Sequence, residues 1–148
     1  MSSPWNRLRA VAVASLPDAG YEASQAALGG TVQVASQRDS VINTGDNLQE
    51  IEIVVLGYNG PVGSDGVPTG AVVSGTCTVQ FIEIAPYPDP NQPDRLLLVG
   101  KTPVTSHPTG RGAVFQCRYN HKFTVLLTNL GGGLAGATSA EVLWRTHR

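Results

Sequence analysis

The sequence predicts an all-β protein: a jelly-roll-like antiparallel β-sandwich of seven to eight strands, preceded by an N-terminal arm. Short segments that alternate apolar and polar residues recur from Thr31 onwards, as half-buried strands do. Clusters of Gly, Pro, Asn and Asp separate them, which is typical of a sandwich. The 17 glycines and 10 prolines are spread along the chain without a period, so they indicate many turns.

The predicted strands follow one another at turn-rich spacings. The residues 31–36, 50–57 and 75–84 alternate clearly, whereas RLLLVG (95–100) is wholly apolar and fits a central strand. The segment GAVVSG (70–75) is either an eighth strand or the lead into the long strand that follows. The remaining predicted strands are AVFQCRY (113–119), KFTVLLTNL (122–130) and SAEVLWR (139–145).

The first 30 residues differ from the rest and are predicted to form an arm, with the sandwich domain at 31–148. Ser3 and Pro4 could begin a short helix, as an N-cap and a first helical residue. The valines and Pro17 favour an extended arm instead. We expect the side chains of this arm to contact a neighbouring molecule: Trp5, Arg7, Leu8, Arg9, Val11, Val13 and Leu16.

Charge is sparse and unevenly distributed. Charged residues make up 14% of the chain, against about 25% in an average domain. Residues 1–94 carry ten acids and three bases, and residues 95–148 carry seven bases and one acid. The two signs either neutralise each other within one subunit or form complementary faces between subunits. The bases are dispersed, so no nucleic-acid partner is expected, and no apolar run approaches the length of a membrane span.

No arrangement of residues predicts an enzyme or a cofactor. His107, His121 and His147 lack a patterned nucleophile and carboxylate, and we expect them to be solvated. Ser64 in GSDG fits a turn within a Gly/Pro loop, and a nucleophile elbow would instead join a strand to a helix. Glu50 and Glu52 alternate outwards on one strand face, as solvated charges do.

Metal binding is not predicted either. Cys117 and His121 are four residues apart, without the paired spacing of zinc ligands. Asp46 and Asp65 lie among Asn, Ser and Gly, but the EF-hand spacing is absent and turn chemistry explains the same residues. Cys77 and Cys117 both fall in phase with core residues, and whether they are bonded to each other stays open.

The last third, FTVLLTNLGGGLAGATSAEVLWR, resembles the closing hairpin of small β-sandwich virion proteins of tailed bacteriophages. Those proteins end in an alternating strand, a turn rich in small residues and a second alternating strand that closes on a basic residue. The group includes capsid decoration (cement) proteins and tail or fibre accessory proteins, many of them homotrimers with N-terminal arms.

The resemblance implies a non-enzymatic capsid decoration protein, located in the virion and assembled in the host cytoplasm. Its expected partners are the major capsid protein or other virion proteins and further copies of itself, with a trimer favoured. An alternative is a carbohydrate- or host-surface-binding module of a phage tail or fibre. In that case Tyr58 and Tyr87, each beside a long loop, are the expected contact residues.

Overall fold

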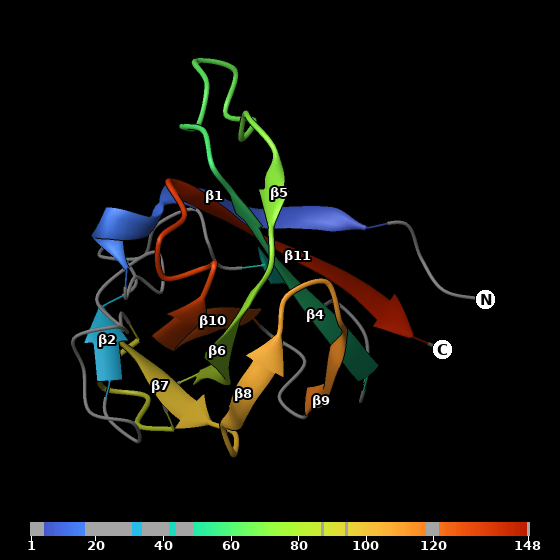
Figure 1. Cartoon of the computed structure of the whole chain (residues 1–148). Helices are drawn as coiled ribbons and strands as arrows, with labels where there is room; N and C mark the ends of the chain where they lie inside the picture. The colour runs from blue at the N-terminus through green and yellow to red at the C-terminus, as the bar shows by residue number, and fades with distance from the viewer. Residues whose placement is uncertain are drawn as a thin grey trace.

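The chain folds into two antiparallel sheets packed face to face, which confirms the predicted β-sandwich (Figure 1). The computed structural model describes residues 5–16, 31–33, 42–43, 49–86, 88–93, 95–117 and 122–147. Within these ranges the helical structure is a single 3-10 turn, Val13–Ser15. None of the described segments is a helix with the length and apolar character that crossing a membrane requires.

The first sheet has β4 at its centre, flanked on one side by β11 and then β1. The other side of β4 is shared, because β9 pairs with its first half and β5 pairs with Gly57 and Tyr58 at its end. The strands of this sheet are β1 (Asn6–Ala12), β4 (Gln49–Tyr58), β5 (Val72–Val73), β9 (Ala113–Cys117) and β11 (Ser139–His147).

The second sheet has the long strand β6 at its centre and runs in the order β2-β7-β6-β10-β3. Strand β8 pairs with the first part of β6, on the side where β7 pairs with the second part. The strands of this sheet are β2 (Thr31–Gln33), β3 (Ile42–Asn43), β6 (Gly75–Pro86), β7 (Arg95–Gly100), β8 (Val104–Pro108) and β10 (Lys122–Gly132).

The core between the sheets is built around stacked aromatic rings. The ring of Phe81 lies 5.2 Å from that of Phe115 and 5.0 Å from that of Phe123, so the stack joins the two sheets. Trp144 meets Phe123 edge-on at 5.5 Å. Such pairs add about 1 kcal/mol each beyond the apolar area they bury. The expectation that Trp144 belongs to the core, from its phase with Val142, is therefore confirmed.

The glycine-rich stretch after β10 is a crossing between the sheets. It carries the chain from β10 in the second sheet to β11 in the first, and its Leu134 is fully buried in the core. A Cβ on Gly75 would lie 2.4 Å from both the carbonyl oxygen of Gly131 and the backbone nitrogen of Leu134. Gly132 has φ +60, a conformation that glycine adopts without strain. Close backbone packing therefore requires glycine at Gly75, and the backbone conformation favours it at Gly132.

Three of the described strands were not predicted from the sequence: β1, β3 and β8. Strand β8 ends in Pro108 and contains Ser106 at φ 49, so its sequence resembles a turn.

His107 lies in strand β8 and is only 9% exposed, with Nε2 2.8 Å from the carbonyl oxygen of Arg111. The expectation of a solvated His107 was wrong. His121 lies outside the described residues, and the side chain of His147 is not described.

Candidate interaction surfaces

Four large apolar side chains are exposed in the described part of the chain, and all belong to the first sheet or its extensions: Trp5 (37% exposed), Val67 (42%), Val72 (62%) and Val114 (53%). They mark three surfaces: the start of β1, the hairpin that follows β4, and the outer edge of β9. A single exposed apolar side chain is ordinary on a protein surface, whereas apolar side chains gathered beside one another indicate a place where another molecule binds.

The described part of the predicted arm, residues 5–16, contains a strand of the sandwich. Residues 6–12 form β1 and pair with β11 of the same chain, with a register shift between Arg7 and Arg9. Leu8 is 6% exposed and belongs to the core, and Val13 and Leu16 pack against it. Val11 is half-buried. The extended conformation matches one of the two predicted alternatives, but the structure gives these side chains partners within their own subunit.

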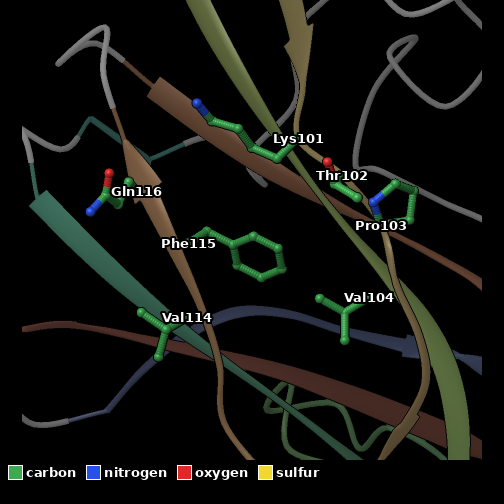
Figure 2. Close-up of a pocket in the computed structure, with 7 residues that line it drawn as sticks. All are labelled: Lys101, Thr102, Pro103, Val104, Val114, Phe115 and Gln116. Atoms are coloured by element: carbon green, nitrogen blue, oxygen red, sulfur yellow. The ribbon is translucent and has the colours of Figure 1, made fainter.

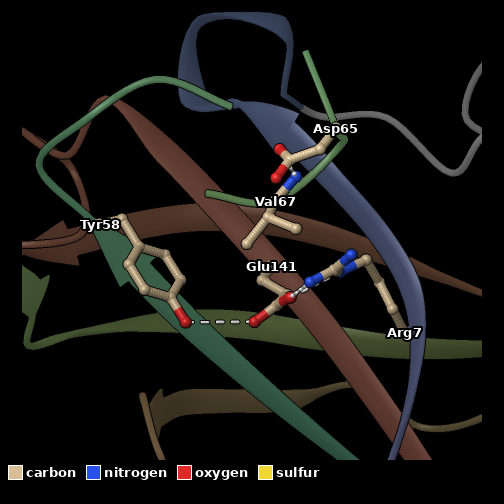
Figure 3. Close-up of polar contacts among 5 residues, drawn as sticks. All are labelled: Arg7, Tyr58, Asp65, Val67 and Glu141. Atoms are coloured by element: carbon tan, nitrogen blue, oxygen red, sulfur yellow. Dashed lines mark hydrogen bonds and ion pairs between the residues drawn. The ribbon is translucent and has the colours of Figure 1, made fainter. Parts of the chain in front are cut away.

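Arg7 and Tyr58 meet at one carboxylate on the outer face of the first sheet (Figure 3). A guanidinium nitrogen of Arg7 lies 2.6 Å from Oε2 of Glu141, and the hydroxyl of Tyr58 donates to Oε1 at 3.1 Å. Burial and the adjacent carboxylate together raise the pKa of Tyr58. Tyr58 is half-buried and its hydroxyl is engaged, so it does not offer the freely exposed ring on which a sugar stacks. Tyr87, the other predicted contact, lies outside the described residues.

Arg9 points the opposite way and reaches across to the second sheet. It is 6% exposed, and Nη2 donates to the carbonyl oxygen of Val125 at 2.9 Å and to Oγ1 of Thr124 at 3.2 Å. Both acceptors lie on β10, next to the short stretch of that strand that β3 covers. Arg9 therefore joins the edges of the two sheets and closes this side of the sandwich.

Trp5 lies over a charged pair beside β1. The guanidinium carbon of Arg145 is 4.1 Å from the centre of the indole ring, and Nε of Arg145 donates to Oε1 of Glu52 at 2.7 Å. A cation held against an aromatic face contributes about 0.5–1 kcal/mol at an exposed site. The guanidinium of Arg145 thus covers part of the Trp5 ring within the same chain, although more than a third of the Trp5 surface remains accessible.

The hairpin formed by residues 59–72, which we call the ribbon, projects from the end of β4 beyond the body of the sandwich (Figure 1). Its two halves are joined by backbone hydrogen bonds from Asn59 to Ala71, Gly60 to Thr69, Thr69 to Pro61 and Gly63 to Val67. Its base is tied to β11, since the hydroxyls of Thr138 and Ser139 donate to the carbonyl oxygens of Asn59 and Gly60.

The tip of the ribbon is a tight turn. Oδ1 of Asp65 accepts a hydrogen bond from the backbone nitrogen of Val67 at 3.1 Å, and Gly66 has φ +80. This is the Asx-turn chemistry that the sequence suggested for Asp65. Asp46 lies outside the described residues. Among those that the structure describes, no three His, Cys, Asp or Glu side chains gather closely enough to hold a metal ion.

On the side of the sandwich opposite Arg9, the two sheets leave a cavity between them. A cavity of about 400 Å³ lies between the segment before β8 and the strand β9 (Figure 2). It is lined by Lys101, Thr102, Pro103, Val104, Val114, Phe115 and Gln116. The sequence offered no signal for it, because its two walls come from different sheets and meet only in the fold.

A buried ion pair lies beside this cavity. The ammonium of Lys101 is 2.7 Å from Oε1 of Glu83, whose side chain is fully buried. The thiol of Cys117 lies 3.7 Å from Oε2 of the same carboxylate.

Cys77 and Cys117 are both buried, and they are not bonded to each other. Burial raises the pKa of the Cys77 thiol to about 11. The Cys77 thiol therefore stays protonated at neutral pH and packs as a small apolar group in the core.

Two of the three ion pairs among the described residues join an acid of the first 94 residues to a base of the rest: Glu83 to Lys101 and Glu52 to Arg145. The uneven charge distribution is thus partly neutralised within one subunit.

Comparisons of the chain with protein-family models, with curated proteins and with solved structures find no match.

Proposed function

We propose that the chain is a non-enzymatic virion structural protein of a tailed bacteriophage, a capsid decoration protein that attaches to the shell through the ribbon. Its partner is the major capsid protein or another virion protein. The observation that carries the proposal is the ribbon itself, an exposed hairpin with a fixed shape and apolar side chains. The sequence resemblance of residues 123–145 supports the choice of a virion, although β10 and β11 lie in different sheets and do not form a hairpin.

The ribbon has the properties of a preorganised binding element. An isolated two-stranded hairpin is at best marginally stable in water. This one is held by its own backbone bonds and by the clamp at its base, and most of its side chains remain exposed. Pro61 and Pro68 stiffen its two halves further. A rigid element loses little conformational entropy when it binds, which favours attachment to a protein surface.

Val67 and Val72 are the side chains through which the ribbon would attach. They are 42% and 62% exposed, and their burial against a partner contributes about 25 cal/mol per Å² of apolar surface. Many copies on one shell would add avidity to a modest single contact. In this proposal the ribbon takes over the attachment role that the sequence suggested for the arm, because the side chains of β1 are engaged with their own sandwich.

Co-sedimentation with phage capsids that lack their decoration protein tests the proposal. The wild-type chain should sediment with the shells, and the double variant Val67→Asp/Val72→Asp should bind about tenfold more weakly or worse, since two apolar contacts become charged. The matched control, Thr102→Asp/Thr105→Asp, adds the same charge at two exposed positions of the opposite side. Circular dichroism of all three proteins checks that the fold is retained.

Two results would contradict the proposal in different ways. If the wild-type chain does not sediment with shells, the virion role is wrong. If it does and the ribbon variant binds equally well, the attachment surface lies elsewhere. The alternative, a module that binds host carbohydrate, predicts glycan-array signals that Tyr58→Ala abolishes. It receives less support, because the Tyr58 hydroxyl is committed to Glu141.

A further inference from the structure

A row of side chains crosses the outer face of the first sheet near the start of β4. Directly opposed residues of neighbouring strands share a face. The register places Val114 of β9 opposite Glu52 of β4, and Glu52 opposite Arg145 of β11. Trp5, which immediately precedes β1, lies against the guanidinium of Arg145. The row therefore spans three strand spacings, about 14 Å, from Val114 to Trp5.

The indole ring of Trp5 is a platform whose position is fixed from within the chain. Trp5 is 37% exposed, and the guanidinium carbon of Arg145 lies 4.1 Å from its ring centre. The bond from Nε of Arg145 to Oε1 of Glu52 holds the guanidinium in turn. A Cβ at Gly112 would collide with this carboxylate, so glycine there leaves room for it. Because these side chains hold one another, little conformational entropy is lost when a ligand stacks on the ring.

The guanidinium of Arg145 has donors to spare. It carries five N–H groups, and the described residues supply an acceptor for one of them, Oε1 of Glu52. The side chain of Arg145 is 27% exposed, so its remaining donors are available to oxygen atoms of a ligand. The aromatic platform and these donors lie side by side, which places an apolar contact next to a polar one.

The adjoining row adds two more polar groups. Gln116 and Glu50 lie opposite each other in the register, and both are exposed. Together with Glu52 and Arg145 they present an amide, two carboxylates and a guanidinium, which are all planar groups with two or more hydrogen-bonding atoms. Such groups match pairs of adjacent hydroxyls. A pyranose sugar carries these hydroxyls around its rim and C–H groups on its faces, and the electron-rich face of an indole attracts C–H groups.

The same features disfavour other classes of ligand. A nucleic acid or an acidic glycan would bring negative charge beside Glu50 and Glu52, against the single cation of Arg145. A protein partner would have to desolvate the Glu52–Arg145 pair, which is costly. Val114 and Trp5 lie at opposite ends of the row and do not form the continuous apolar centre of a protein interface. A neutral sugar keeps the ion pair hydrogen-bonded through its hydroxyls.

We propose that the outer face of the first sheet binds a neutral oligosaccharide. One pyranose ring stacks on Trp5 with its hydroxyls bonded to Arg145, and the adjoining ring lies over Gln116 and Glu50. This site is separate from the ribbon, because Glu52 and Tyr58 are six residues, or about 20 Å, apart along β4. It also differs from the sugar contact that the sequence suggested at Tyr58.

Binding of the full-length chain to an array of neutral and acidic glycans is the first test. Neutral glycans should give the signals. Trp5→Ala should weaken binding about tenfold or more, whereas Trp5→Tyr keeps an aromatic face and should retain most of the affinity. Tyr58→Ala, the matched control, removes another aromatic side chain of the same face and should bind like the wild type. Thermal melts confirm that the three variants are folded.

Titration of the best neutral glycan in solution tests the contacts. Binding should change the tryptophan fluorescence of the wild type, because Trp5 is exposed and Trp144 belongs to the core. Calorimetry should show that Arg145→Met binds about tenfold more weakly, since the donors are lost. Added salt should have little effect on a neutral ligand.

Four results would overturn the proposal: no neutral glycan binds, binding is confined to acidic glycans, Trp5→Ala binds unchanged, or Tyr58→Ala loses as much as Trp5→Ala. The outcome is independent of the attachment to shells. A chain that binds glycans without sedimenting with capsids would contradict only the virion role, and a chain that sediments without binding glycans would contradict only the sugar site.

Discussion

The guanidinium of Arg9 donates a hydrogen bond to the carbonyl oxygen of Val125, 2.9 Å away, and so joins the N-terminal strand of one sheet to β10 of the other. An arginine that is only 6% exposed must have its donors satisfied by the protein, because desolvating a charge without partners is costly. The same contact satisfies a backbone carbonyl of β10 outside the segment that β3 covers. One side chain therefore determines how this side of the sandwich is closed.

Replacing Arg9 should destabilise the protein strongly. Arg9→Met keeps the apolar stem and removes the donors, and we expect a loss of about 2–3 kcal/mol in the free energy of unfolding. Arg7→Met, whose native side chain is 39% exposed, should cost less, about 1 kcal/mol. Urea unfolding monitored by Trp fluorescence measures both. Equal losses for the two variants would mean that the hydrogen bond from Arg9 to Val125 does not add to the free energy of unfolding.

The buried pair of Lys101 and Glu83 should show strong coupling. Lys101→Met leaves a fully buried carboxylate without its cation, and we expect a loss of about 3 kcal/mol. Adding Glu83→Met removes that carboxylate, so the double variant should be more stable than Lys101→Met alone. A double-mutant cycle in urea determines the coupling. If the double variant loses the sum of the two single losses, the pair is not coupled.

Close backbone packing at the crossing between the sheets predicts a glycine requirement at one position and none at another. Gly75→Ala places a Cβ against backbone atoms of Gly131 and Leu134 and should cost about 3 kcal/mol or more. Gly136→Ala meets nothing within 4 Å and should be neutral or slightly stabilising, since it restricts the unfolded chain. Thermal melting points of the two variants compare them directly. A tolerant Gly75 would contradict the packing described.

Alkaline pH should destabilise the fold through Cys77. Its pKa is raised to about 11 by burial, from 9.0 in an accessible thiol. Between these values the folded state binds more protons than the unfolded state, so the free energy of unfolding falls as pH rises. The slope approaches about 1.4 kcal/mol per pH unit. Urea titrations from pH 8 to 11 measure it, and Cys77→Ala should flatten the curve. An equal slope in that variant would point to another group, with Tyr58 the next candidate.

Much of the fold was predictable, because its central strands alternate clearly. The alternating strands β6, β10 and β11 extend the predictions by only two residues at their ends, and the wholly apolar β7 occupies the predicted residues 95–100. Such strands bury one face of a long ladder, so their pattern is strong. The ends of elements depend on local turns, which the pattern does not encode.

The candidate surfaces were harder to predict, because each depends on pairing between distant residues. Strand β1 carries two arginines, and nothing in its sequence shows that one faces solvent and the other faces the second sheet. The ribbon was predicted as a loop, although Val62 pairs with Pro68 across its two halves. The edge of β9 becomes visible only when its neighbours are known.

The placement of β11 between β1 and β4 has a consequence for how the protein is made. Among the described strands, β1 pairs with β11 alone, and Arg7 and Glu141 are 134 residues apart in the chain. Strand β1 leaves the ribosome before every other described strand, and it must wait until residues 139–147 are translated before it finds its partner. Folding dominated by such long-range pairings is slow. A nascent chain that stalls before Ser139 would leave both β1 and the edge of β4 exposed, and such edges are prone to aggregation.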